Sequence, residues 1–145
     1  MEVINGVVAV IYRDSPAEER KYLLLKHKNN FWTFIGGKID PTDSSIRDGL
    51  EREINEELEL LPTDYDLTDT GIVNEFIYGE EKPDRAGKKG VTYYFTGILT
   101  TSKEINCKAE IVQLDWLNKE EILGHLEFDD IKRKFLEVVN TSSTQ

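Results

Sequence analysis

The sequence predicts an α/β (α+β) fold in which a mixed β-sheet packs between helices. Strand-like runs precede the longest amphipathic segment of the chain, more strand-like runs follow it, and the chain ends in helical patterns. Strands on both sides of a helix in sequence form a layered fold when the helices cover the apolar faces of the sheet. With 145 residues, the chain suits one domain of usual size, and we expect residues 1–145 to form it.

The first strands are predicted from runs of β-branched and aliphatic residues. Residues 7–12 read VVAVIY and residues 22–25 read YLLL, and both runs are typical of strands. A turn at Asn29 and Asn30 leads into the aromatic run 31–35, which ends at a pair of glycines. We therefore expect two strands, then a short aromatic strand that runs into Gly36 and Gly37.

A helix is predicted from Ser45 to about Leu60. Its apolar residues recur every four positions and form one stripe: Ile46, Leu50, Ile54 and Leu58. Ser45 and Asp48 form a pattern similar to a capping box. Gly49 costs a helix interior about 1 kcal/mol relative to alanine, so we expect it to pack closely against a strand.

The second half of the chain predicts three more strands and two short helices. The strands are expected at residues 71–78, 91–99 and 110–117, with a polar loop at 79–90 between the first two. The helices are expected at residues 119–123 and 129–139.

Composition excludes several classes of partner. The formal net charge is -10, whereas a protein that binds duplex nucleic acid normally carries a basic face. No apolar stretch approaches the roughly 20 residues of a membrane helix, and the N-terminus does not look like a signal peptide. A single cysteine, Cys107, excludes an internal disulfide and fits a reducing compartment, so we expect a cytoplasmic protein without a membrane partner.

Three glutamates on the predicted helix carry the strongest chemical signal. Glu53, Glu56 and Glu57 lie at i, i+3 and i+4, so they project from one face and repel one another. A divalent cation such as magnesium would offset this repulsion and leave room for substrate phosphates. Arg52 precedes Glu56 by one turn and can fix its rotamer. The alternative is a solvated acidic face without a cation.

This segment resembles the signature of the Nudix hydrolase family, G-x5-E-x7-R-E-U-x-E-E-x-G-U, where U is apolar. The run from Arg52 to Leu58 reads REINEEL, Leu60 supplies the last apolar residue, and Gly37 matches the opening glycine. Three departures exist. Counted from Gly37, the first glutamate is replaced by Asp43; counted back from Arg52, the position holds Ser44, so the loop is one residue longer. Glu59 replaces the late glycine.

The resemblance implies a Nudix-like α/β/α sandwich with a mixed central sheet. It also implies magnesium-dependent attack of water on a diphosphate linkage, with manganese as an alternative cation. Glu53, Glu56 and Glu57 would be metal ligands together with a backbone carbonyl of Gly36 or Gly37, and Glu53 is our choice of general base. A later acid often completes the set, and Glu110 is the candidate.

Substrate contacts are expected from basic and aromatic residues near these motifs. The candidates are Lys38, Lys89, Phe76 and Tyr93, with Lys88 and Tyr78 as further options. Each also has a simpler interpretation as a core or surface residue. His27 and His125 are isolated in the sequence, and we expect structural or exposed positions for both.

The substrate class stays open at the level of sequence. The aromatic run before the glycines, the segment KGVTYYF and the segment LEFDD resemble the dinucleoside polyphosphate branch of the family. A nucleoside triphosphate is the next candidate, followed by a nucleotide sugar or ADP-ribose. The rival classes are a catalytically inactive nucleotide sensor and a purely structural module. The protein is expected to be a monomer or a homodimer.

Overall fold

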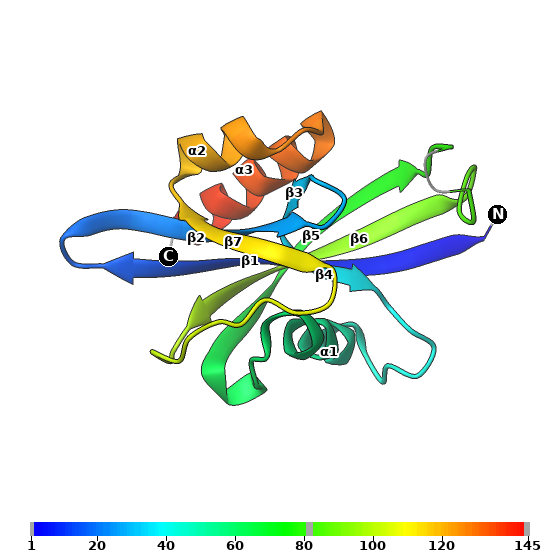
Figure 1. The fold of residues 1–145 in the computed structure, drawn as a ribbon. Coiled ribbons are helices and arrows are strands. Elements are labelled where there is room, and N and C mark those ends of the chain that lie inside the picture. Colours follow the sequence, from blue (N-terminus) through cyan, green and yellow to red (C-terminus); the bar gives the residue numbers. More distant parts are fainter. Residues whose placement is uncertain (1, 81–82, 144–145) are drawn as a thin grey trace.

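A mixed β-sheet lies between two helical layers in the computed structural model, which describes residues 2–80 and 83–143 (Figure 1). Helix α1 (Ile46–Leu58) covers one face, and helices α2 (Lys119–His125) and α3 (Asp129–Ser143) cover the other. The predicted fold class is therefore confirmed. Among the described residues, no helix combines the length and the apolar character that a bilayer crossing requires.

The strands are β1 (Val3–Ser15), β2 (Glu18–His27), β3 (Trp32–Thr33), β4 (Ile35–Lys38), β5 (Tyr65–Ile77), β6 (Lys89–Leu99) and β7 (Ile111–Leu117). A short 3-10 helix, η1 (Pro62–Asp64), precedes β5. The main order is β3-β2-β1-β6-β5, while β4 pairs with β1 and β7 pairs with β2. The pairing of β1 with β6 is parallel, and the other pairings are antiparallel.

Strand β1 changes its antiparallel partner halfway along its length. Residues 6–9 pair with β4, whereas residues 12–15 pair with β2. A Cβ on Gly36 would clash with the carbonyl oxygen of Val7, so only glycine lets β4 lie this close to β1. The sheet is thus divided between β4 and β2 on one side of β1, and the candidate site lies beside this division.

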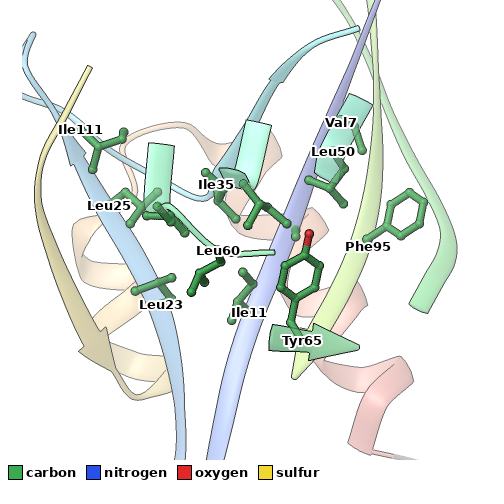
Figure 2. Close-up of a cluster of buried hydrophobic side chains, with 13 residues drawn as sticks. Val7, Ile11, Leu23, Leu25, Ile35, Leu50, Leu60, Tyr65, Phe95 and Ile111 are labelled. Atoms are coloured by element: carbon green, nitrogen blue, oxygen red, sulfur yellow. The ribbon is translucent and has the colours of Figure 1, made fainter. Parts of the chain in front are cut away.

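The alternation of β1 builds two hydrophobic cores. Val7, Ala9 and Ile11 join the core beneath α1 (Figure 2), while Val10 joins the core beneath α2 and α3. The helix stripe predicted from the sequence supplies three fully buried residues to the first core: Leu50, Ile54 and Leu58. Each such side chain contributes about 1.5–3 kcal/mol through burial. This packing fixes which face of α1 is left for the cavity.

The two ends of α1 show how the sequence sets its limits. The Ser45 hydroxyl accepts a hydrogen bond from the backbone N–H of Asp48 at 3.0 Å, as expected. Glu59, in the place of a glycine, has φ 54 at the C-cap. Gly49 does not face a strand as predicted: a Cβ there would lie 2.7 Å from Ile39 Cδ1 and 2.9 Å from Asp43 Oδ2. A side chain at position 49 would therefore displace Ile39 or Asp43 of the loop before the helix.

The other predicted elements are present with shifted ends. Strand β5 begins at Tyr65 rather than at residue 71, because a bulge between Asp69 and Ile72, with Gly71 at φ 75, joins two paired segments into one strand. Helix α3 continues to Ser143. Residues 81 and 82 of the predicted loop lie outside the described residues.

Candidate active site

A cavity of about 650 Å³ lies beside the part of β1 that pairs with β4. Its wall includes Gly6, Val7 and Val8 of β1, and Gly36, Gly37 and Lys38 of β4. The side chains that bring chemistry to it are Glu53, Glu56 and Glu57 from α1, His27 from β2, and Tyr78, Arg85 and Glu110 from loops. The three glutamates predicted from the helix signature thus share one cavity with Glu110.

Glu53 and Glu57 form the most unusual pair in this cavity. Glu57 is only 9% exposed, and the two carboxyl groups share a hydrogen bond. Burial and the charge of Glu53 raise the pKa of Glu57 to about 8. Burial also raises the pKa of Glu53. Without a cation, burial therefore disfavours the charged form of both carboxyl groups, and the charge of Glu53 adds to this effect at Glu57.

The glycines of β4 and β1 make room for this pair. A Cβ on Gly37 would lie 2.5 Å from Glu53 Oε1, and a Cβ on Gly6 would lie 3.3 Å from the carbonyl oxygen of Gly37. The backbone of β4 can therefore approach the Glu53 carboxylate closely. This arrangement explains why a glycine precedes the acidic helix at this distance.

Arg52 links Glu53 and Glu56 to strand β4 and to the loop before the helix. Its Nη1 donates to Glu53 at 3.2 Å and to Glu56 at 3.3 Å, and its Nη2 donates to the carbonyl oxygen of Lys38 at 3.2 Å. Its Nε and Nη2 also donate to the carboxylate of Asp43. These hydrogen bonds lower the pKa of Asp43, helped by a backbone N–H from Asp40, and raise the pKa of Arg52.

The donor set fits a magnesium ion better than a metal that needs a complete protein cage. Among the described residues, no three His, Cys, Asp or Glu side chains converge closely enough to hold a metal ion. Magnesium usually takes one or two carboxylates and keeps several waters. Glu53 and Glu57 supply such a pair, and a cation would favour the charged form of Glu57, which burial disfavours, so that its pKa is raised.

Glu110 reaches the cavity from the turn before β7. Its Oε2 lies 2.8 Å from Nε2 of His27, and its Oε1 lies 3.9 Å from Nζ of Lys28. The charge of Glu110 also contributes to the raised pKa of Glu57, after burial and Glu53. The predicted fourth acid therefore lies in the same cavity as the helix glutamates, although a histidine holds it.

The predicted substrate contacts divide into two groups. Lys38 lines the cavity. Lys89, Phe76 and Tyr93 are not in its wall as described: Lys89 Nζ pairs with Glu75 at 2.6 Å, the ring of Phe76 covers Gly90, and Tyr93 packs against the core beneath α1. Among the further options, Lys88 pairs with Glu2 at 3.1 Å, whereas Tyr78 lines the cavity.

Three residues of the wall had no role in the sequence analysis. The rings of His27 and Phe31 stack with centroids 4.6 Å apart and an interplanar angle of 15°. The guanidinium of Arg85 lies 5.6 Å from the ring centroid of Tyr78. No spacing in the sequence links residue 27 to residue 110, since the pairing of β2 with β7 joins them. Arg85 is a basic residue in a mostly polar loop, a signal too weak to single it out.

Solved structures with the same fold have low sequence identity to this chain. The Ap4A hydrolase of C. elegans, in a binary complex, has a TM-score of 0.75 at 20% identity and covers 94% of this chain and 98% of its own. The dihydroneopterin triphosphate pyrophosphohydrolase of E. coli has a TM-score of 0.78 at 17% identity, with 94% and 95% covered. The NUDIX domain of Shewanella oneidensis NrtR, complexed with ADP ribose, has a TM-score of 0.70 at 18% identity, with 96% and 90% covered.

The protein family is identified by comparison of the sequence with family models. A search of curated proteins found no match, but the family model of the NUDIX domain matches residues 4–139. This match confirms the resemblance seen in the helix signature. Because it spans nearly the whole chain, the protein belongs to the Nudix family, whose hydrolases act on phosphoanhydride bonds.

Proposed function

We propose that the protein uses magnesium to hydrolyse a nucleoside diphosphate-linked compound, with a dinucleoside polyphosphate or a nucleoside triphosphate as the substrate. The observation that carries this proposal is the pair of Glu53 and Glu57 carboxyl groups in one cavity wall beside Gly37. A cation bound beside two adjacent carboxyl groups stabilises both as carboxylates.

Glu53 and Glu57 would hold the cation, with Glu56, the carbonyl group of Gly37 and Glu110 as the additional donors. A bound magnesium or manganese ion neutralises charge on the phosphates and lowers the pKa of a bound water. The cavity has the size of typical small-molecule sites, about 300–1,000 Å³. The donor types and the volume of about 650 Å³ support a metal–nucleotide substrate.

Glu53 is the proposed general base. It accepts a hydrogen bond from Arg52 at 3.2 Å, and this contact favours its ionised form. Burial and the charge of Glu53 favour the neutral form of Glu57. Glu53, which Arg52 contacts directly, is therefore our choice of the carboxylate that accepts a proton from the attacking water.

Lys38 and Arg85 are the proposed phosphate contacts. Both line the cavity, in a chain whose net charge of -10 repels a polyanion. Arg85 replaces Lys89 in this role, because Lys89 is paired with Glu75 outside the cavity wall. Tyr78 and Phe31, which also line the cavity, are aromatic surfaces against which a base can stack.

Dinucleoside polyphosphates rank first among the substrates because the sequence segments around the helix resemble that branch. The fold alone does not identify the substrate, since proteins with this fold include hydrolases of Ap4A and of dihydroneopterin triphosphate and a domain that binds ADP ribose. We place the activity in the cytoplasm and expect a monomer or a homodimer.

The test is a substrate panel with the purified protein. Dinucleoside polyphosphates, nucleoside triphosphates, ADP-ribose and nucleotide sugars are incubated with Mg²⁺ in ¹⁸O-labelled water. Glu57→Gln is expected to abolish turnover. Glu51→Gln, a matched change on the same helix but outside the described cavity wall, is expected to leave it unchanged. The position of ¹⁸O in the products identifies the phosphorus that is attacked.

The rival function is a nucleotide sensor. Tight nucleotide binding without turnover on any member of the panel would favour it over the hydrolase. The three glutamates on one cavity wall, with Arg52 bonded to two of them, support the enzyme, because a sensor does not need to activate water.

A further inference from the structure

The turn between β2 and β3 holds the backbone of His27 in place. The N–H of His27 donates to the carbonyl oxygen of Phe31 at 2.8 Å, and the N–H of Asn30 donates to the carbonyl oxygen of His27 at 2.8 Å. Asn30 adopts φ 68, a left-handed conformation that asparagine tolerates better than most residues. The turn therefore fixes the backbone position from which the His27 side chain extends.

The hydrogen bonds of the imidazole determine its tautomer. The backbone N–H of Asn29 donates to Nδ1 of His27 at 3.1 Å, so Nδ1 is the acceptor and the ring proton lies on Nε2. Nε2 lies 2.8 Å from Oε2 of Glu110, so this N–H donates to the carboxylate. The stacked ring of Phe31 limits rotation of the imidazole, whose side chain is 13% exposed.

The backbone of Glu110 is held from two sides. The N–H of Lys28 donates to the carbonyl oxygen of Glu110, and the N–H of Lys108 donates to the carbonyl oxygen of Glu57, both at 2.8 Å. Ala109 lies between them with φ 55. The turn of residues 108–111 thus links the end of α1 to the turn after β2, and it presents Glu110 to the cavity.

The side chain of Glu110 is much less constrained than its backbone. It is 58% exposed, and Glu57 repels it whenever the Glu57 carboxyl group is ionised. Lys28, 3.9 Å from Oε1, attracts it toward the exposed turn. The short contact with His27 draws this carboxylate toward the wall it shares with Glu57.

We propose that His27 is a positioning residue for Glu110: its Nε2–H holds the carboxylate at the cation-binding wall. This role rests on the proposed function, because it matters only if the cavity binds a cation. Carboxylates that bind metals are commonly oriented by an outer hydrogen bond, and loss of such a bond costs about 10–100-fold in metal affinity or activity. A carboxylate oxygen has two lone pairs, so Oε2 can accept from His27 without losing all its capacity as a ligand.

The first experiment observes the tautomer directly. The chain has two histidines, so His125→Gln leaves the ring nitrogens of His27 as the only imidazole signals in a ¹⁵N NMR spectrum. We expect the Nε2–H tautomer in the metal-free protein, with an Nε2 resonance that moves in Glu110→Ala. An Nδ1–H tautomer, or an Nε2 resonance insensitive to Glu110→Ala, would overturn the proposal.

The second experiment measures positioning by a double-mutant cycle on Mn²⁺ affinity, read by electron paramagnetic resonance without substrate. His27→Phe keeps a flat ring beside Phe31 but removes the donor, and it is expected to weaken Mn²⁺ binding about 10–100-fold. In a Glu110→Gln background, the same change is expected to add little. His27→Gln, which retains a donor, should recover part of the loss, and His125→Phe is the matched control.

The outcomes separate this inference from the proposed function. Additive effects of His27→Phe and Glu110→Gln, in a protein that still binds Mn²⁺ and turns over nucleotides, would overturn the positioning role alone. A protein that binds no Mn²⁺ and hydrolyses no member of the panel would overturn the proposed function, and the positioning role with it, even if NMR shows the His27–Glu110 hydrogen bond.

Discussion

Arg52 and Asp43 form a bidentate ion pair, with Nε 2.9 Å from Oδ1 and Nη2 2.9 Å from Oδ2. The Asp43 side chain is 6% exposed, and its carboxylate lies over Gly49. The first acid of the Nudix signature falls at position 43 when it is counted from Gly37 and at position 44 when it is counted back from Arg52. The structure shows that Asp43 binds Arg52. The loop is one residue longer than in the signature, and an aspartate in place of the glutamate makes this contact.

Asp43→Glu is expected to destabilise the protein, although it restores the family residue. The added methylene enters a packed site, and overpacking costs about 1–3 kcal/mol. Urea unfolding measures the loss, and turnover should fall because Arg52 also contacts Glu53 and Glu56. Asp40→Glu is the matched control, since that side chain is 50% exposed. An Asp43→Glu variant as stable and active as the parent would show that the site tolerates either acid.

The metal-free protein is expected to lose stability as the pH rises from about 4.5 to 8. The folded pKa of Glu57 is raised to about 8 from 4.5, so between these values the folded chain keeps a proton that the unfolded chain has released. The stabilisation from this proton is complete below pH 4.5 and is lost as the pH rises to about 8. Over this range the free energy of unfolding falls by at most about 1.4 kcal/mol per pH unit.

Urea unfolding in EDTA at several pH values measures this dependence. Glu57→Gln should show a flatter profile, because the variant has no proton to lose at this position. Saturating Mg²⁺ should also flatten the profile of the parent, since a cation stabilises the carboxylate form. Parallel profiles for the parent and Glu57→Gln would contradict the raised pKa.

Glu59→Gly is expected to stabilise the protein. Glu59 has φ 54, and a left-handed conformation costs an L-residue roughly 1–2 kcal/mol. Glycine removes this strain but gains freedom in the unfolded chain, which costs about 0.4–1 kcal/mol, so the net gain should be near 0.5–1 kcal/mol. Thermal unfolding provides the measurement. The exposed ion pair with Lys108 contributes little, and Lys108→Gln is the control for its loss.

Tyr65→Phe is expected to be neutral or stabilising. The Tyr65 hydroxyl is buried, and among the described residues it has no hydrogen-bond partner; its place in the core is shown in Figure 2. A buried polar group without a partner costs about 1–3 kcal/mol. Removal of the hydroxyl should therefore raise the urea midpoint. Tyr22→Phe serves as the comparison, because the Tyr22 hydroxyl has a hydrogen-bond partner in Arg20. A clear loss of stability in Tyr65→Phe would reveal a partner for the hydroxyl.

The sequence predicted the parts of the site that depend on one helix. Glu53, Glu56 and Glu57 share a cavity wall because helical spacing is fixed, and the predicted stripe of Leu50, Ile54 and Leu58 is buried in the core beneath α1. Tyr93 shows what the sequence alone does not decide: its neighbour Thr92 lines the cavity, while Tyr93 packs against the core beneath α1. Successive side chains of a strand point to opposite faces, so a shift of one residue decides whether position 92 or position 93 faces the cavity. Only the pairing register determines this.

The parallel pairing of β1 with β6 has a consequence for how the chain folds. Val3 pairs with Lys89 and Tyr12 with Ile98, so the centre of the sheet closes only after most of the chain has been synthesised. The β1–β2 hairpin and α1 contain local contacts and can form early, whereas pairings across such long loops are slow. We expect a folding rate limited by the docking of β6, during which β1 stays exposed to wrong partners.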